Sequence, residues 1–211
     1  MSPFRRSSLL ARLAAVTMCS TLLGVGSLEA QNAVYAEDEV KAAFLYHFGT
    51  YVEWPSGAPA DDAITIAVLG AEGVARQLQG FLPGRRIQGR AVQVRRLGSI
   101  AELGDDEVLF IGPENNAQLP ALIEAVASRP VLVVTDAADG LARGAMVNFQ
   151  LIDERVRFEI SLPNAEEAGL MLSSRLLSAA LRVETARSWF DKFAPPRTRP
   201  RPKSSRRQQL A

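Results

Sequence analysis

The spacing of apolar positions changes along the chain, and each change marks a structural element. From Asp38 to Trp54 apolar side chains recur every three or four residues, which is typical of an amphipathic helix. Val108–Ile111 is apolar throughout, as in a strand covered on both faces. The same reasoning predicts strands at 63–69, 92–97 and 131–135, and helices at 72–81 and 117–127. Alternating strands and helices favour an α/β fold with a largely parallel sheet.

The pattern changes in the C-terminal third of the chain. Residues 145–152 and 155–162 predict two strands joined at Asp153 and Glu154, with alternating side chains in the second strand. Residues 164–183 then show a helical apolar stripe, and a second helical piece is expected at 185–193. We therefore expect an α/β domain with a mixed, mostly parallel sheet flanked by helices, ending in a β-hairpin and a long helix.

The N-terminal segment has the organisation of a secretory signal peptide. Three arginines among the first twelve residues precede an apolar run from Leu13 to Val25. This run is shorter than the ~20 residues that span a bilayer, and small residues follow it, which favours export by the Sec route. Cleavage after Ala30 or after Ala36 fits this pattern. An uncleaved anchor and a lipoprotein modified at Cys19 are weaker alternatives.

These boundaries divide the chain into a signal peptide (1–36), one α/β domain (37–194) and a basic tail (195–211) that is expected to be disordered. The domain carries 15 basic and 22 acidic side chains, so its net charge is about −7. An acidic body argues against nucleic acid as a partner. Cys19 is the only cysteine and falls in the signal peptide, so the exported domain must be stabilised by its core alone.

The sequence shows little catalytic equipment. His47 is the only histidine, and we expect it on the surface of the first helix, where it would not suffice for a metal site or a serine triad. Gly70 and Gly73 follow a strand, but the remaining glycines of a dinucleotide fingerprint are missing. The arginines between positions 85 and 96 indicate either an anion-binding patch or a solvated face. We therefore predict no enzyme activity, no cofactor and no metal.

Six sequence blocks together resemble the YfiR family of exported proteins. They occur in the family's order and extend from Glu39 to Val183, almost the whole domain. The blocks are residues 41–55 (KAAFLYHFGTYVEWP), 68–70 (VLG), 109–111 (LFI), 144–149 (GAMVNF), 156–160 (VRFEI) and 168–177 (AGLMLSSRLL). Family members often carry cysteines near two of these blocks, and this chain has none there.

The resemblance implies a periplasmic regulator. It implies an exported protein that binds the periplasmic part of an inner-membrane diguanylate cyclase and represses it, and so acts in cyclic-di-GMP signalling and biofilm control. It also suggests an outer-membrane lipoprotein as a second partner. The sequence leaves this second partner and a homodimer open. The missing cysteines argue against redox control in this chain.

Arg157, Glu159 and Arg175 are the predicted partner-binding residues. Apolar side chains take one face of Val156–Ile160, so Arg157 and Glu159 share the other face and are expected to project into water together. Arg175 follows in one of the clearest matching blocks of the resemblance and is expected to reach the same region. On this view, Glu159→Ala would release the partner without lowering thermal stability. A simple cross-strand ion pair is the alternative, and the aromatic residues of 44–54 are the second candidate surface.

A different class of function remains as the alternative. An α/β domain of this kind binds small molecules or substrates beyond the carboxyl ends of its parallel strands. In this chain that region lies near Gly70, Gly112 and Asp136. The scarcity of histidine, cysteine and nucleotide motifs counts against an enzyme there.

Overall fold

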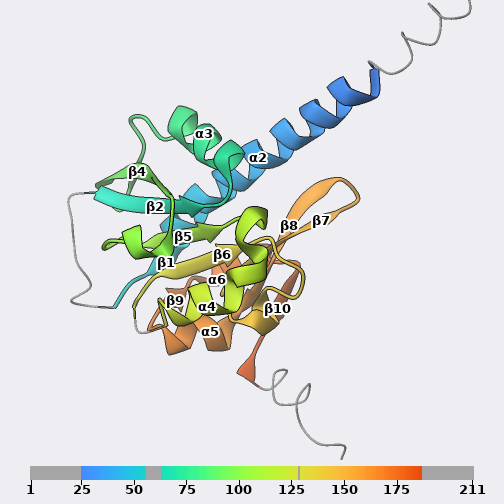
Figure 1. Cartoon of the computed structure of the whole chain (residues 1–211). Helices are drawn as coiled ribbons and strands as arrows, with labels where there is room; N and C mark the ends of the chain where they lie inside the picture. The colour runs from blue at the N-terminus through green and yellow to red at the C-terminus, as the bar shows by residue number, and fades with distance from the viewer. Residues whose placement is uncertain (1–24, 56–62, 128, 187–211) are drawn as a thin grey trace, which may run out of the picture.

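The computed structural model describes residues 25–55, 63–127 and 129–186 (Figure 1). Residues 1–24 of the predicted signal peptide and the predicted basic tail lie outside this part of the chain. Helix α2 (Val25–Tyr51) begins earlier than the expected Asp38. No proline interrupts this stretch, so nothing in the backbone forces a later start. Among the described residues, no helix has both the length and the apolar composition needed to cross a membrane.

Among the described residues, eight strands form one sheet whose central strands are parallel (Figure 1). The two hairpin partners β8 and β3 run antiparallel to β7 and β4, and β10 runs parallel to β8. In spatial order the strands are β10 (Arg182–Glu184), β8 (Arg155–Ser161), β7 (Val147–Ile152), β6 (Leu132–Thr135), β5 (Val108–Ile111), β2 (Ala63–Leu69), β4 (Arg90–Leu97) and β3 (Arg86–Ile87). The predicted mixed, mostly parallel sheet is confirmed, and so is the hairpin.

Helices cover both faces of the sheet. α2 and α3 (Glu72–Phe81) pack together over one face, and α4 (Leu119–Glu124) and α5 (Leu162–Glu167) lie over the other. From β2 the chain first crosses to β4, on one side of β2 in the sheet. It then crosses back to β5 and β6, on the other side of β2. Because crossovers between parallel strands are right-handed, the two directions place their helices on opposite faces. In the described part of the chain, three 3-10 helices complete the connections: η1 (Ile100–Glu102), η2 (Pro113–Gln118) and η3 (Leu141–Arg143).

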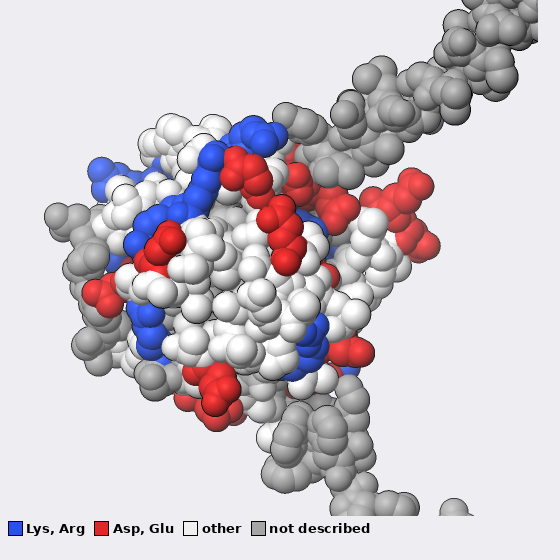
Figure 2. Space-filling model, in the orientation of Figure 1, with Lys and Arg blue, Asp and Glu red and all other residues white. Residues whose placement is uncertain are grey.

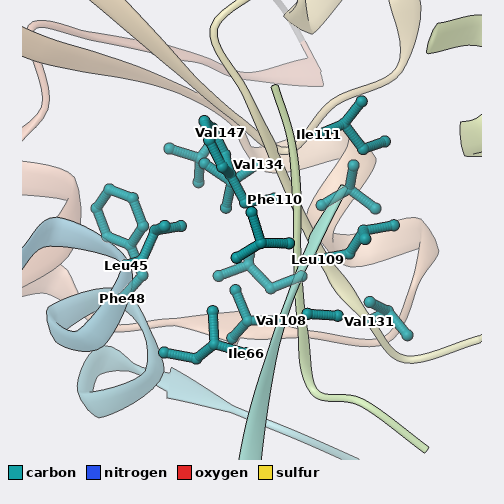
Figure 3. Close-up of a cluster of buried hydrophobic side chains, with 14 of the residues drawn as sticks. Leu45, Phe48, Ile66, Val108, Leu109, Phe110, Ile111, Val131, Val134 and Val147 are labelled. Atoms are coloured by element: carbon teal, nitrogen blue, oxygen red, sulfur yellow. The ribbon is translucent and has the colours of Figure 1, made fainter. Parts of the chain in front are cut away.

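Phe48 of α2 belongs to the core, and Phe44, Tyr46 and Tyr51 pack against the core while partly buried. Phe48 is fully buried and packs at ring-centroid distances of 5.0 Å from Phe158 and 5.7 Å from Phe149. Phe110 joins the cluster through Phe149 at 5.9 Å. Figure 3 shows Leu45 and Phe48 of α2 facing the buried side chains of the central strands. Burial of this cluster attaches α2 to the sheet.

The long helix predicted over 164–183 is wrong. The chain there forms α5, the short strand β9 (Met171–Leu172), α6 (Ser174–Ala179) and β10. Gly169 has φ +74°, which ends the helical path, and the Ser173 hydroxyl caps a new helix by accepting the Leu176 N–H. β9 pairs with β1 (Val52–Glu53), which also ends α2 three residues earlier than expected. Long-range strand pairing therefore overrode the helical periodicity.

Two other helix predictions need correction. The helix expected at 117–127 is divided between η2 and α4, because a 3-10 turn already begins at Pro113. The helix expected to begin at residue 164 begins at Leu162 instead, and the Asn164 N–H is donated to the capping Ser161 hydroxyl at 3.4 Å. The helical piece expected at 185–193 falls mostly outside the described residues.

Candidate interaction surface

The end of the β7–β8 hairpin projects beyond its neighbouring strands (Figure 1). β6 pairs with β7 only at Val147 and Asn148, and β10 pairs with β8 only from Glu159 onward. Residues 150–157, called the hairpin end below, therefore form a two-stranded ribbon outside the sheet. Its turn, Asp153 and Glu154, has φ values of 49° and 59°. This left-handed turn geometry matches the twist of the two strands.

Exposed apolar side chains gather around the hairpin end. Of the five large apolar side chains that are exposed in the described part of the chain, four border it. Leu151 and Ile152 lie on the hairpin itself, with exposed fractions of 59% and 39%. Val40 of α2 and Leu181, just before β10, flank it. A concentration of exposed apolar side chains on a projecting element is typical of an interaction site.

A hollow lies on each side of the hairpin end. The helix-side hollow, about 580 Å³, is bounded by α2 residues Val40 and Phe44 and by Leu151 and Val156 of the hairpin. The strand-side hollow has a volume of about 630 Å³. Ile152 and Arg157 of the hairpin form one wall, and residues 179–181 form the other. Side chains of neighbouring strand positions point to opposite faces, which is why Leu151 and Ile152 open into different hollows.

Glu159 is held inside a hydrogen-bond network. Its Oε1 accepts from Asn148 Nδ2 at 3.1 Å and from Gln150 Nε2 at 3.2 Å. Its Oε2 accepts from Arg182 Nε at 3.1 Å and Nη2 at 2.5 Å. The side chain is 8% exposed. The expectation that Glu159 projects freely into water is wrong, because β10 pairs with β8 at this position and covers it.

Two partners of Glu159, Asn148 and Arg182, lie beside it in one cross-strand row. Thr135 of β6 pairs with Asn148 of β7, Asn148 with Glu159 of β8, and Glu159 with Arg182 of β10. The ion pair raises the pKa of Arg182, chiefly through its hydrogen bonds to Glu159. Arg182 also donates to Glu184 at 2.5 Å. Glu159 thus joins the antiparallel hairpin to the edge strand.

Arg157 and Arg175 are both exposed, as predicted, but they lie in different places. Arg157 lines the strand-side hollow. Arg175 lies in the first turn of α6, whereas it is the opposite end of that helix, Ala179, that borders the hollow. The structure therefore brings Arg157 and Glu159 onto one strand face and leaves Arg175 outside that pair. The part these residues play in partner binding stays a prediction.

The alternative small-molecule site is filled by the protein itself. A methyl group added at Gly112 would lie 2.4 Å from the Gly70 carbonyl oxygen, and one at Gly70 would lie 2.0 Å from Asn115 Oδ1. Beside them, the buried Lys41 ammonium donates to Asp136 Oδ2 at 2.7 Å and pairs with Glu37 at 2.7 Å. Side chains of α2 and η2 therefore lie against the carboxyl ends of β6 and β2.

The pKa values of Lys41 and Asp38 are shifted by this close packing. Burial lowers the pKa of Lys41, but its bonds to Asp136 and Glu37 outweigh that effect, so the pKa rises above 10.5. Burial raises the pKa of Asp38 above 3.8, against the opposing influence of Lys41. The charged lysine is therefore the stable form, and it attaches α2 to the carboxyl end of β6.

Gly112→Ala is expected to destabilise the protein by about 1–3 kcal/mol, because the methyl group has no room against the Gly70 backbone. Gly80→Ala is the matched control. No atom lies within 4 Å of the added methyl group, and Gly80 sits in α3, so alanine should stabilise slightly. Urea unfolding of both variants measures the difference. Equal stability of Gly112→Ala and the wild type would mean that the strand ends are open.

The arginines between positions 85 and 96 are engaged within the fold. Arg90 pairs with Glu107 and Arg95 with Asp106, and both acids are buried. Arg96 pairs with Glu72 at 2.7 Å, and Arg85 stacks 3.8 Å from the centre of the Phe81 ring. Of the two predicted roles, an anion-binding patch is the poorer fit, because these cations already have partners.

His47 is exposed on α2, as expected, and stacks with Tyr51 at 6.5 Å. Within the described residues, no three histidine, cysteine or acidic side chains come together in a group that could hold a metal ion. Sequence reasoning missed the exposed apolar residues of the hairpin end. Their signal was two adjacent apolar residues, Leu151 and Ile152, directly before the turn, because one sheet face cannot bury both.

These features define a class: an α/β domain with occupied strand ends and a projecting, partly apolar hairpin. The family model for YfiR/HmsC-like proteins matches residues 38–181. The chain belongs to this family of regulatory domains.

Other comparisons add little. No curated protein matches the chain. Among solved structures, a conserved domain protein from Vibrio cholerae has a TM-score of 0.43 and 14% identity, over 58% of this chain and 55% of that one. The ABC domain from Streptococcus pneumonia in complex with L-Trp has a TM-score of 0.42 and 14% identity, over 57% and 55%. The match thus spans about half of each structure, and likenesses at this level carry no argument about function.

Proposed function

We propose that this chain is an exported periplasmic protein that binds the periplasmic part of a membrane-bound diguanylate cyclase and represses it. Family membership supports the regulatory role. The hairpin end supports action by binding, because its exposed Leu151 and the hollows beside it form a surface that lacks a partner within the described chain. The filled strand ends count against an enzyme or a small-molecule receptor at that position.

The binding surface in this proposal is the hairpin end with Arg157 at its centre. Figure 2 shows acidic side chains at the projecting end of the hairpin, where the turn carries Asp153 and Glu154. Arg155 and Arg157 follow along the strand, so the charge changes from negative to positive over a short distance. Such a change of sign favours one docking register over others. Arg175 stays a predicted partner-binding residue, although it lies at the end of α6 that is away from the strand-side hollow. Glu159 contributes by holding β10 beside β8.

The single observation that carries the proposal is the projecting hairpin with exposed apolar side chains on both faces. Arg157→Glu is expected to weaken repression by about tenfold or more, because it places a like charge where the partner meets a cation. The measurement is cyclic-di-GMP synthesis by the membrane-embedded cyclase at increasing concentrations of the purified protein. Arg76→Glu is the control, since Arg76 is also exposed but lies on α3. If both variants repress like the wild type, the surface lies elsewhere. If the wild type fails to repress, the proposed function is wrong.

A further inference from the structure

We propose that the partner adds an extended segment as a strand along the free edge of β8 at the hairpin end. This inference rests on the proposed function, because it describes how the signalling partner is held. Its starting point is the register of the sheet: β10 pairs with β8 from Glu159 onward, and no described strand pairs with that edge of β8 before it.

The backbone groups of Val156 point to this free edge. The Phe158 carbonyl accepts the Leu181 N–H at 2.8 Å, so the backbone groups of Phe158 face β10. Backbone groups of residues two positions apart in a strand point the same way. The N–H and C=O of Val156 therefore face the side where β10 would continue. No described residue pairs with them there, and an extended peptide would find both a donor and an acceptor.

The strand-side hollow lies along this edge and gives the segment a place to dock. Its walls are Ile152 and Arg157 of the hairpin on one side and Ala180 and Leu181 on the other. Ile152 and Leu181 are exposed and offer apolar contact. A strand added here would place every second side chain into the hollow.

The charges select the kind of segment. Arg155 and Arg157 are exposed on the same face, and neither has an ion-pair partner among the described residues. They favour a segment in which an apolar side chain enters the hollow and carboxylates lie next to the two arginines. A second copy of this chain fits poorly. An antiparallel pairing of two β8 edges centred on Val156 would place Arg155 opposite Arg157 twice, and like charges directly opposite are unfavourable.

Val156→Pro tests the inference because, of the backbone hydrogen-bonding groups of β8, proline removes the outward N–H of residue 156 and no donor to β7. An edge strand tolerates proline where the N–H faces solvent. Val156→Ala is the matched control, since it also loses the valine side chain but keeps the N–H. The probe is the purified periplasmic domain of the diguanylate cyclase, with affinity measured by calorimetry. We expect Val156→Pro to bind roughly ten- to hundredfold more weakly than Val156→Ala. Without the N–H of residue 156, a carbonyl of the partner strand would be left without a hydrogen-bond donor.

Hydrogen exchange on the wild type gives a second readout that does not depend on the proline variant folding. The Val156 amide should be protected at least about tenfold in the complex. If the wild type binds while Val156→Pro equals Val156→Ala and the amide stays unprotected, edge addition is wrong and the proposed function stands. If the wild type does not bind the cyclase domain, both fail. Sedimentation showing a dimer that Val156→Pro dissociates would assign the edge to a second copy and overturn the choice of partner.

Discussion

Glu159→Ala is expected to lower the free energy of unfolding by about 3 kcal/mol. The substitution removes the acceptor for the Asn148 amide, which is fully buried, and for the Arg182 guanidinium. Hydrogen bonds to a charged group contribute about 1.5–3 kcal/mol, and an unpaired buried amide adds its own desolvation cost. Urea unfolding followed by circular dichroism measures the change.

Arg157→Ala is the matched control for this prediction. Arg157 lies two positions earlier on the same face of β8 but is exposed. Its removal should change stability by no more than about 0.5 kcal/mol. Equal stability of both variants would show that the Glu159 network does not support the edge strand. The contrast also matters for binding experiments, because loss of the partner in Glu159→Ala would reflect a loosened β10 rather than a lost contact.

Lys41→Met is expected to cost about 3–5 kcal/mol, because it leaves a buried carboxylate without its cation. The side chains of Lys41 and Asp136 are 9% and 11% exposed, and Asp136 Oδ1 already lacks a hydrogen-bond partner among the described residues. Adding Asp136→Asn to the variant removes the uncompensated charge and should restore most of the loss. A double-mutant cycle measures the coupling. Additive effects of the two substitutions would contradict a direct Lys41–Asp136 interaction.

The pH dependence of the same pair has a definite sign. The folded-state pKa of Lys41 lies above its ordinary value of 10.5. The folded state therefore holds this proton more tightly than the unfolded state does. The contribution of Lys41 to stability should be complete below pH 10.5 and should decline as the pH rises through the higher folded-state value. Unfolding curves of the wild type and Lys41→Met should approach each other in that alkaline range.

The local sequence was sufficient to predict strands that are covered on both faces. The strands β2, β5 and β6 are buried on both faces, so their continuous apolar runs identify them without knowledge of their neighbours. The hairpin was predictable because alternation in β8 flanks a two-residue turn. The exposure of Arg157 followed from the same alternation. Family membership also followed from the sequence, through blocks distributed over the whole domain.

Only the tertiary structure determined that Glu159 is buried and that residues 164–183 do not form one helix. Both depend on the pairing of β8 with β10, two segments more than twenty residues apart in the sequence. That pairing turns a position that alternates as exposed into a buried one, and it draws Arg182–Glu184 out of a helical pattern into a strand. Leu151 and Ile152 show the reverse, since they are exposed only because the neighbouring strands end before reaching them. Alternation along one strand records which side chains share a face, but how far the adjacent strands extend determines whether that face is covered.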